Sequence, residues 1–261
     1  MALLTIPLIA EGKILGFLMV VAIFVITIYY LTSKKEVYIR RVAGLDAIEE
    51  AVGRSTEMGK PHFALIGVGM FDHWTLAAIA MLEFQAHICA RTETRLIVPC
   101  GGSTTAFITR PVALDVVKNA YIAEGKEFDE KDMPFLVGGK GWAFGAGTVA
   151  MIQKLKPGGL VLTGSYCSVA LHIAEQASQQ GVMTIASGSY MGNVAALACA
   201  ADYTMIGEEV LAAGAYLTRE PAKLASIRTQ DLLKFVAIAT TLIGVIITQA
   251  GSDIIIQLLG T

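Results

Sequence analysis

Two long apolar segments near the ends of the chain constrain its fold more than any other feature. Residues 14–31 (ILGFLMVVAIFVITIYYL) form an uncharged run of 18 residues. At ~1.5 Å per residue, such a helix crosses a hydrocarbon core of ~30 Å. A second uncharged run covers residues 235–251. We therefore predict transmembrane helices over 14–32 and 231–251, with short external tails at 1–13 and 252–261.

Each apolar segment has an alternative explanation. A cleaved signal peptide fits the first segment poorly, because the residues before it (MALLTIPLIAEGK) lack a basic region and no small-x-small cleavage site follows. The second segment contains three threonines and a glutamine, Thr240, Thr241, Thr248 and Gln249. These polar residues weaken its apolar character, so a buried core helix remains an alternative explanation for this segment.

The second segment carries small residues at a regular spacing. Thr240, Gly244 and Thr248 stand four residues apart, and so do Ala237 and Thr241. Small side chains at this spacing form a groove that another transmembrane helix can approach closely. We expect these five positions to mediate self-association, with the second helix facing protein and the first facing lipid.

Basic residues predict the orientation in the membrane. Eight of them flank the two segments on the inner side, namely Lys34, Lys35, Arg40, Arg41, Arg219, Lys223, Arg228 and Lys234, whereas Lys13 is the one basic residue on the outer side. Short loops rich in Lys and Arg stay in the cytoplasm. We expect a two-pass protein of the cell membrane, with residues 33–230 in the cytoplasm and both termini outside.

Charge and cysteine content exclude some classes of function. The net charge is −2 and gives no reason to expect a nucleic-acid partner. The four cysteines form no Cys-x-x-Cys pair and no histidine stands at ligand spacing, so we predict free, mostly buried thiols and no metal site.

The region between the two segments alternates short strand-like and longer helix-like runs. Strands are predicted over 62–68, 94–100, 134–138, 160–164, 182–187 and 202–207, and helices over 44–59, 75–92, 110–125, 144–156, 167–180, 193–201 and 208–220. This alternation is typical of a parallel sheet covered by helices on both faces. The predicted fold class is α/β, a Rossmann-like doubly wound sheet, flanked by the two transmembrane helices.

Most of the predicted strands end in a cluster of Gly, Ser and Thr. The candidate ligand-binding residues in these clusters are Gly67, Gly69, Gly101, Ser103, Gly164, Ser165, Gly188 and Ser189. In a doubly wound sheet such turns meet at the carboxyl ends of the strands, where ligands bind. The alternative is turn chemistry alone, because any such sheet needs small residues where strands turn into helices.

No complete catalytic or cofactor motif occurs in the chain. Gly67-x-Gly69 continues to Asp72, where a dinucleotide loop requires glycine, and Thr163 and Ser187 replace the first glycine of a nucleophile elbow. Asp72-His73 is an acid–imidazole pair at the predicted edge, for which capping or packing is the alternative. We assign no catalytic residue, and the cofactor stays unknown.

Three segments resemble a known family: residues 42–61 (VAGLDAIEEAVGRSTEMGKP), 162–181 (LTGSYCSVALHIAEQASQQG) and 205–220 (MIGEEVLAAGAYLTRE). The chain is similar to an uncharacterised prokaryotic family of membrane proteins that is described only as a domain of unknown function. The resemblance implies a Rossmann-like cytoplasmic domain tethered by terminal helices in a prokaryotic cell membrane. It implies no activity, cofactor or catalytic residue.

Three classes of function follow. The first is a membrane-anchored, homo-oligomeric assembly or scaffold protein without catalytic machinery, whose partners are its own copies and the lipid bilayer. The second is a membrane-tethered module that binds or senses a nucleotide or another anion at the Gly/Ser/Thr edge. The third is an enzyme at that edge. The lack of catalytic machinery favours the first class, and so does the apolar region between the two segments, which is rich in Ala, Gly, Val and Met, because exposed apolar surface is commonly an interface.

Overall fold

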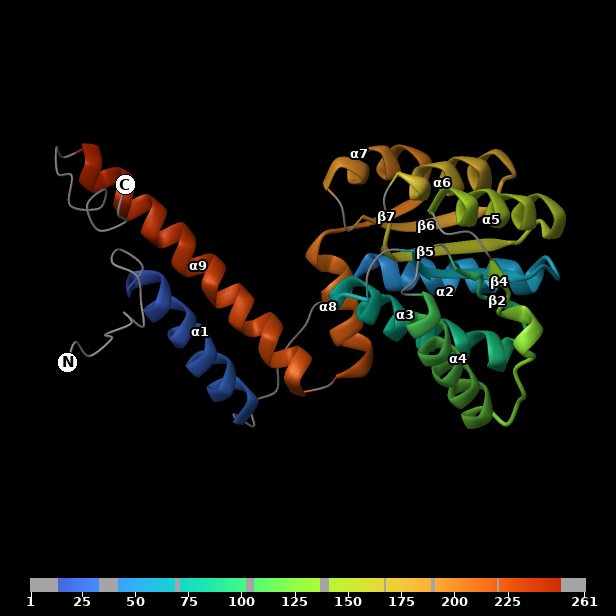
Figure 1. Ribbon diagram of the computed structural model, residues 1–261, viewed down its shortest axis with the longest axis horizontal. Helices are drawn as coiled ribbons and strands as arrows, with labels where there is room; N and C mark the ends of the chain where they lie inside the picture. The colour runs from blue at the N-terminus through green and yellow to red at the C-terminus, as the bar shows by residue number, and fades with distance from the viewer. Residues whose placement is uncertain are drawn as a thin grey trace, which may run out of the picture. The chain divides into compact units, whose positions relative to one another are not determined.

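The computed structural model describes residues 14–32, 42–68, 71–101, 106–136, 141–166, 168–188, 191–219 and 221–249. The chain folds into two compact units. One unit is the central region Ile39–Thr218, and the other combines the two terminal regions, Met1–Tyr38 and Arg219–Thr261. The order of the elements is shown in Figure 1.

The central unit is built on a parallel five-stranded sheet. Its strands are β1 (His62–Gly67), β2 (Leu96–Ile97), β5 (Gly159–Ser165), β6 (Met183–Gly188) and β7 (Tyr203–Ile206), in the spatial order β2-β1-β5-β6-β7. All four strand pairs are parallel. A second, two-stranded parallel sheet pairs β3 (Cys100–Gly101) with β4 (Phe135–Leu136). The predicted α/β class and the mainly parallel sheet are thus confirmed.

Helices cover both faces of this sheet (Figure 1). They are α2 (Ala43–Glu57), α3 (His73–Thr92), α4 (Ala106–Ala123), α5 (Gly141–Leu155), α6 (Val169–Gln179), α7 (Met191–Ala200) and α8 (Glu208–Thr218), with a short 3-10 helix, η1 (Glu130–Asp132). Each of the predicted helices and strands of the central region corresponds to one of these elements, with shifts at the ends and one interrupted strand.

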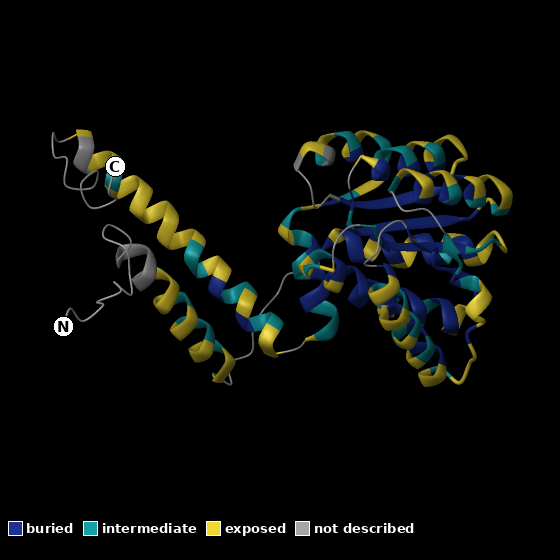
Figure 2. Cartoon of the chain, viewed as in Figure 1, coloured by how far each residue is buried: buried dark blue, intermediate teal, exposed yellow. Residues whose placement is uncertain are grey.

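The core follows the two-residue period of the strands. Phe63 and Leu65 of β1 pack with α5 and α6 on one face of the sheet. Ala64 and Ile66, between and after them, pack with α3 and α4 on the other face. Since both faces are covered, the central strands are buried almost end to end (Figure 2). This is why they read in sequence as short continuous apolar runs rather than as alternating ones.

The strand predicted over 94–100 is interrupted. Val98 and Pro99 separate β2 from β3, and Pro99 has no N–H with which to continue the ladder. Before the break the chain pairs with β1, and after it with β4. Val98 donates to the Asp132 carbonyl over 2.8 Å, which carries the backbone across the break.

Two helices begin four or more residues earlier than the sequence predicted. Helix α4 starts at Ala106, so Pro111 lies inside it rather than in its first turn. Helix α9 (Pro221–Gln249) starts ten residues before the predicted span. Pro221 occupies its first position, where the missing N–H costs nothing. The polar residues that follow belong to the same helix as the apolar segment.

The terminal unit contains α1 (Ile14–Thr32) and α9, which run antiparallel. The Thr27 hydroxyl donates to the Thr229 hydroxyl over 3.3 Å, and the Arg228 guanidinium lies 5.0 Å from the Tyr30 ring centre. The C-terminal part of α1 therefore packs against the N-terminal part of α9. Most described side chains of both helices are exposed (Figure 2).

Among the described residues, one helix is long and apolar enough to cross a membrane, Pro221–Ile246. The described side chains of α1 belong to a shorter apolar stretch, Met19–Thr32. The tails predicted at 1–13 and 252–261 lie outside the described residues.

Candidate functional site

The chain order reverses between β1 and β5. From β1 the chain leads outward to β2, and it returns on the other side of β1 as β5. The connections on the two sides of β1 therefore diverge at its carboxyl end. Crevices for ligands in open α/β sheets form at such a point. The residues that could line one here include Gly67 at the end of β1 and Gly164 and Ser165 at the end of β5.

Gly67 and Gly164 are required by the backbone at this point. Their φ angles are +108° and +102°, which side-chain-bearing residues rarely adopt. A Cβ on Gly164 would lie 2.3 Å from the Ile66 carbonyl oxygen, and one on Gly67 would lie 2.9 Å from the Ser165 nitrogen. The register between β1 and β5 also shifts here. Close approach of the two strands is therefore sufficient to explain both glycines.

A tyrosine fills the space next to them. The Tyr166 hydroxyl accepts a hydrogen bond from the Gly67 N–H over 2.8 Å, and Tyr166 packs in the core beside Phe144 and Val169. Burial raises the pKa of Tyr166 far above its usual range, so the phenol stays neutral. In a phosphate-binding loop the N–H at the end of the first strand turns toward the ligand. Here the protein itself binds that N–H.

Other polar groups at this edge also bind the backbone. The Thr163 hydroxyl donates to the Leu65 carbonyl over 3.2 Å. By contrast, the Ser187 hydroxyl, one residue before the end of β6, is buried and has no hydrogen-bond partner among the described residues. In the sequence, Ser187 begins the strand-end cluster Ser187-Gly188-Ser189-Tyr190 and replaces the first glycine of a nucleophile elbow.

The remaining candidate ligand residues fall into two groups. Gly101 ends β3 with a φ of +149°, and a Cβ there would lie 2.3 Å from the Leu136 carbonyl oxygen, so the β3–β4 pairing requires glycine. Gly188 pairs with Ile206 in the β6–β7 ladder. Gly69, Ser103 and Ser189 lie outside the described residues.

The Asp72-His73 pair has a capping role. Asp72 is the N-cap of α3, and its carboxylate accepts hydrogen bonds from the Thr75 N–H over 3.0 Å and from the Thr75 hydroxyl over 3.2 Å. The exposed His73 ring lies 5.0 Å from the Trp74 ring. These contacts support the alternative of capping and packing, and they give the pair no base-and-nucleophile geometry.

Buried titratable groups in the core are held in their neutral forms. The pKa of His62 is lowered to about 4 by burial, and its Nε2 lies 3.0 Å from the Gln85 Oε1. Burial raises the pKa of the Cys89 thiol far above its usual range and that of Cys100 to about 12. Both thiols are free, as predicted, and neither is a nucleophile at neutral pH. Cys199 is free and exposed, and Cys167 lies outside the described residues.

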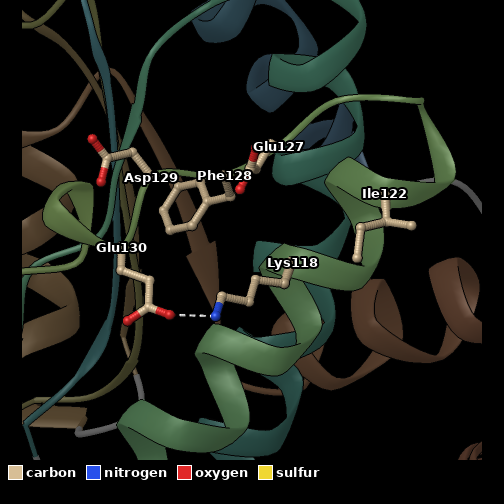
Figure 3. Close-up of a pocket in the computed structure, with 6 residues that line it drawn as sticks. All are labelled: Lys118, Ile122, Glu127, Phe128, Asp129 and Glu130. Carbon is tan, nitrogen blue, oxygen red and sulfur yellow. Dashed lines mark hydrogen bonds and ion pairs between the residues drawn. The ribbon is translucent and has the colours of Figure 1, made fainter.

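Two cavities lie at the opposite, amino-terminal edge of the sheet. The larger, of about 640 Å³, is lined by Lys118 and Ile122 of α4 and by residues 127–130 (Figure 3). Lys118 forms an ion pair with Glu130 across it. A neighbouring cavity of about 340 Å³ surrounds Arg95 and Asp132, whose side chains form an ion pair at the starts of β2 and β4. The sequence predictions did not single out these residues. Exposed ion pairs of this kind indicate a solvated surface rather than a reactive centre.

The candidate association surface on α9 is exposed. Ala237, Thr240 and Thr241 are exposed, and Gly244 is half-buried. Thr240 donates to the Val236 carbonyl over 2.8 Å and Thr241 to the Ala237 carbonyl over 2.7 Å, so the helix itself satisfies both hydroxyls. The side chain of Thr248 lies outside the described residues. We define Ala237, Thr240, Thr241 and Gly244 as the small-residue face.

Within the part of the chain that the structure describes, no three His, Cys, Asp or Glu side chains are grouped so that they could hold a metal ion.

A family model described as a domain of unknown function (DUF6754) matches residues 8–259. The chain belongs to this family. The match includes both terminal helices and the whole α/β region, so the family is defined by the combination of the two. No curated protein and no solved structure matches the chain.

Proposed function

We propose that this member of the DUF6754 family is a membrane-anchored assembly protein of a prokaryotic cell. In this proposal α1 and α9 cross the bilayer as an antiparallel pair, the α/β unit lies in the cytoplasm, both termini lie outside, and copies associate through the small-residue face. The protein acts as a scaffold without a reaction of its own.

The observation that carries the membrane anchor is the exposed apolar surface of the helix pair. Phe235, Leu242 and Ile246 of α9 are 73%, 59% and 68% exposed, and Phe24 of α1 is 68% exposed. In water this surface would cost about 25 cal/mol per Å² of apolar area. In a bilayer it costs nothing, and the threonine hydroxyls of α9 already have partners within the helix, as a membrane requires.

Antiparallel packing fits a two-pass topology. The end of α1 and the start of α9 lie together at the Tyr30–Arg228 contact. Both connections to the α/β unit therefore leave the helix pair at one end. In the sequence, the basic residues predicted to stay in the cytoplasm follow the first span and precede or open the second, which is this same end of the helix pair.

Self-association is proposed for the small-residue face because small side chains let helix backbones approach closely in lipid, where no hydrophobic drive brings helices together. The test is native mass spectrometry of the full chain extracted in mild detergent. A defined multiple of 27.7 kDa without a bound small molecule supports an assembly unit. A monomer across all protein concentrations contradicts it.

A ligand-binding or sensing function is the second candidate. The strand order supports it. If β2 and β3 are counted as one interrupted strand, with β4 beside it, the order becomes β4-β2/β3-β1-β5-β6-β7. This order matches that of a Rossmann-like doubly wound sheet. The buried Ser187 hydroxyl also favours a polar ligand near the end of β6. In the same mass spectrum, a stoichiometric adduct of nucleotide size on a monomer or dimer would favour this function, or an enzyme at that edge.

A further inference from the structure

Large apolar side chains are exposed on the cytoplasmic α/β unit at the starts of three helices. They are Phe71 and Leu76 at the start of α3, Phe107 and Ile108 at the start of α4, and Trp142 at the start of α5. Between 40% and 69% of the surface of each is exposed. Single exposed apolar residues need no explanation, but a group of them on one side of a domain marks a surface that contacts something.

These five residues, which we call the apolar rim, belong to one edge of the sheet. Helices α3, α4 and α5 follow the carboxyl ends of β1, β3 and β4. A Cβ on Gly141, next to Trp142, would lie 3.6 Å from the Val68 side chain just after β1. The Phe107 ring lies 5.2 Å from the Phe135 ring of β4. The rim therefore follows neighbouring strand ends.

The rim lacks the acidic residues that usually favour helix starts. The first turns of α3, α4 and α5 contain no Asp or Glu, although negative side chains stabilise this position. The Asp72 carboxylate, next to Phe71 in the sequence, is engaged as the cap of α3. A surface of this composition is compatible with an anionic and apolar partner, and it would not repel one.

The chain enters the α/β unit at this same edge. A Cβ on Gly44, in the first turn of α2, would lie 2.4 Å from the Met205 side chain near the carboxyl end of β7. The nine residues 33–41 precede this point and span at most ~32 Å. Four of them are basic, Lys34, Lys35, Arg40 and Arg41. The chain also leaves from this side, because Gly214 of α8, shortly before α9, contacts Ala77 in the second turn of α3.

We propose that the apolar rim rests on the cytoplasmic surface of the bilayer, with Trp142 and Phe107 at the level of anionic phospholipid headgroups. The inference rests on the membrane anchoring proposed above. Trp and other aromatic rings favour this interface, because one part of it is apolar and the other is wet. The basic residues of the adjoining sequence, residues 33–41, are attracted to anionic lipid. The short connections keep the rim within reach of that surface.

Tryptophan quenching in vesicles tests this placement. The chain has two tryptophans, so the full-length Trp74→Phe protein reports on Trp142 alone. It is reconstituted in vesicles of phosphatidylcholine and phosphatidylglycerol whose acyl chains are brominated near the headgroup. We expect a roughly twofold loss of Trp142 fluorescence relative to unbrominated vesicles, because bromine quenches an indole that it contacts at the interface.

Two further single-tryptophan proteins supply the controls, both in the Trp74→Phe, Trp142→Phe background. Ile122→Trp places the reporter at an exposed site at the end of α4, on the opposite edge of the sheet, and should show no loss. Ile238→Trp places it on the exposed surface of α9 and reports whether the helix is in the bilayer.

The outcomes separate the two proposals. Quenching of Trp142 and Ile238→Trp but not of Ile122→Trp supports the rim at the bilayer. Quenching of Ile238→Trp alone overturns the rim proposal and leaves the anchor intact. If Trp142 emission instead changes with the protein-to-lipid ratio and not with bromination, a second copy covers the rim, which also overturns the proposal. No quenching of Ile238→Trp contradicts the anchor itself.

Discussion

The Tyr166 hydroxyl accepts a hydrogen bond from the Gly67 N–H over 2.8 Å and so joins the carboxyl ends of β1 and β5. The two residues are 99 positions apart in the sequence. The contact lies where the chain order of the sheet reverses, at the position that a ligand occupies in many proteins with such sheets. In this protein the side chain of Tyr166 links the two strand ends there.

Tyr166→Phe should destabilise the central unit. The substitution keeps the ring but leaves the Gly67 N–H without its acceptor, and an unsatisfied buried donor costs about 1–3 kcal/mol. Denaturant unfolding of the full chain in detergent, followed by circular dichroism, measures the loss. Tyr203→Phe is the matched control, because Tyr203 is 40% exposed, and it should change stability by less than about 0.5 kcal/mol. Equal stability of the two variants would show that the hydrogen bond contributes nothing.

Gly164→Ala should be severely destabilising. It combines a positive φ with a Cβ only 2.3 Å from the Ile66 carbonyl oxygen. We expect a loss of more than about 3 kcal/mol, or failure to fold, because backbone on both sides must move. Gly53→Ala in α2 is the control, since a Cβ there meets nothing within 4 Å, and it should stabilise by up to about 1 kcal/mol. Thermal unfolding of both variants makes the comparison. A stable Gly164→Ala protein would disprove the close approach of β1 and β5.

The stability of the protein should fall between about pH 6.5 and pH 4 because of His62. Burial lowers its pKa to about 4 in the folded state, whereas the unfolded chain binds the proton near pH 6.5. Falling pH therefore favours unfolding through this window, by about 3 kcal/mol in all. Unfolding free energies measured across the window for the wild type and His62→Gln give the difference. Parallel pH profiles of the two proteins would show that His62 does not cause the change.

Gly244→Leu should weaken self-association. The leucine side chain fills the small-residue face of α9 and keeps another helix from approaching closely. Ala239→Leu adds a similar side chain to an exposed position on another face of α9 and should leave the oligomer intact. The mass distribution of each variant in detergent reports the outcome, with at least about a tenfold loss of affinity expected for a contact worth 1.4 kcal/mol. An unchanged oligomer mass in Gly244→Leu would remove the small-residue face as the interface.

The predictions of local structure were mostly correct because they rest on local signals. Short apolar runs and helical periods predicted the α-helices of the central unit and its strands, with β2 and β3 as a single strand and without η1, and the parallel sheet followed from their alternation. The errors are local too. The helix predicted from residue 110 begins at Ala106, and Pro99 splits a strand that the apolar run 94–100 presented as continuous.

The site could be located by its glycines but not interpreted from them. Gly67, Gly101 and Gly164 do stand at strand ends, as their spacing predicts. Close backbone contact is sufficient to explain each glycine, and that depends on what a Cβ there would touch: Ser165, Leu136 and Ile66 respectively. These contacting residues are far from the glycines in the sequence. The contacts between β1 and β5 also depend on a shift of register between the two strands, whose position the sequence does not reveal.

The sequence by itself determined the apolar terminal segments, the alternation of strands and helices, and the glycines that their turns require, because each of these follows from periods and conformational limits within a few residues. The tertiary structure alone decided the strand order, the antiparallel contact of Thr27 with Thr229, the Tyr166–Gly67 hydrogen bond and the exposed apolar rim. These are pairings between residues far apart in the chain, and the free energy that selects them comes from packing of the whole core rather than from any local pattern.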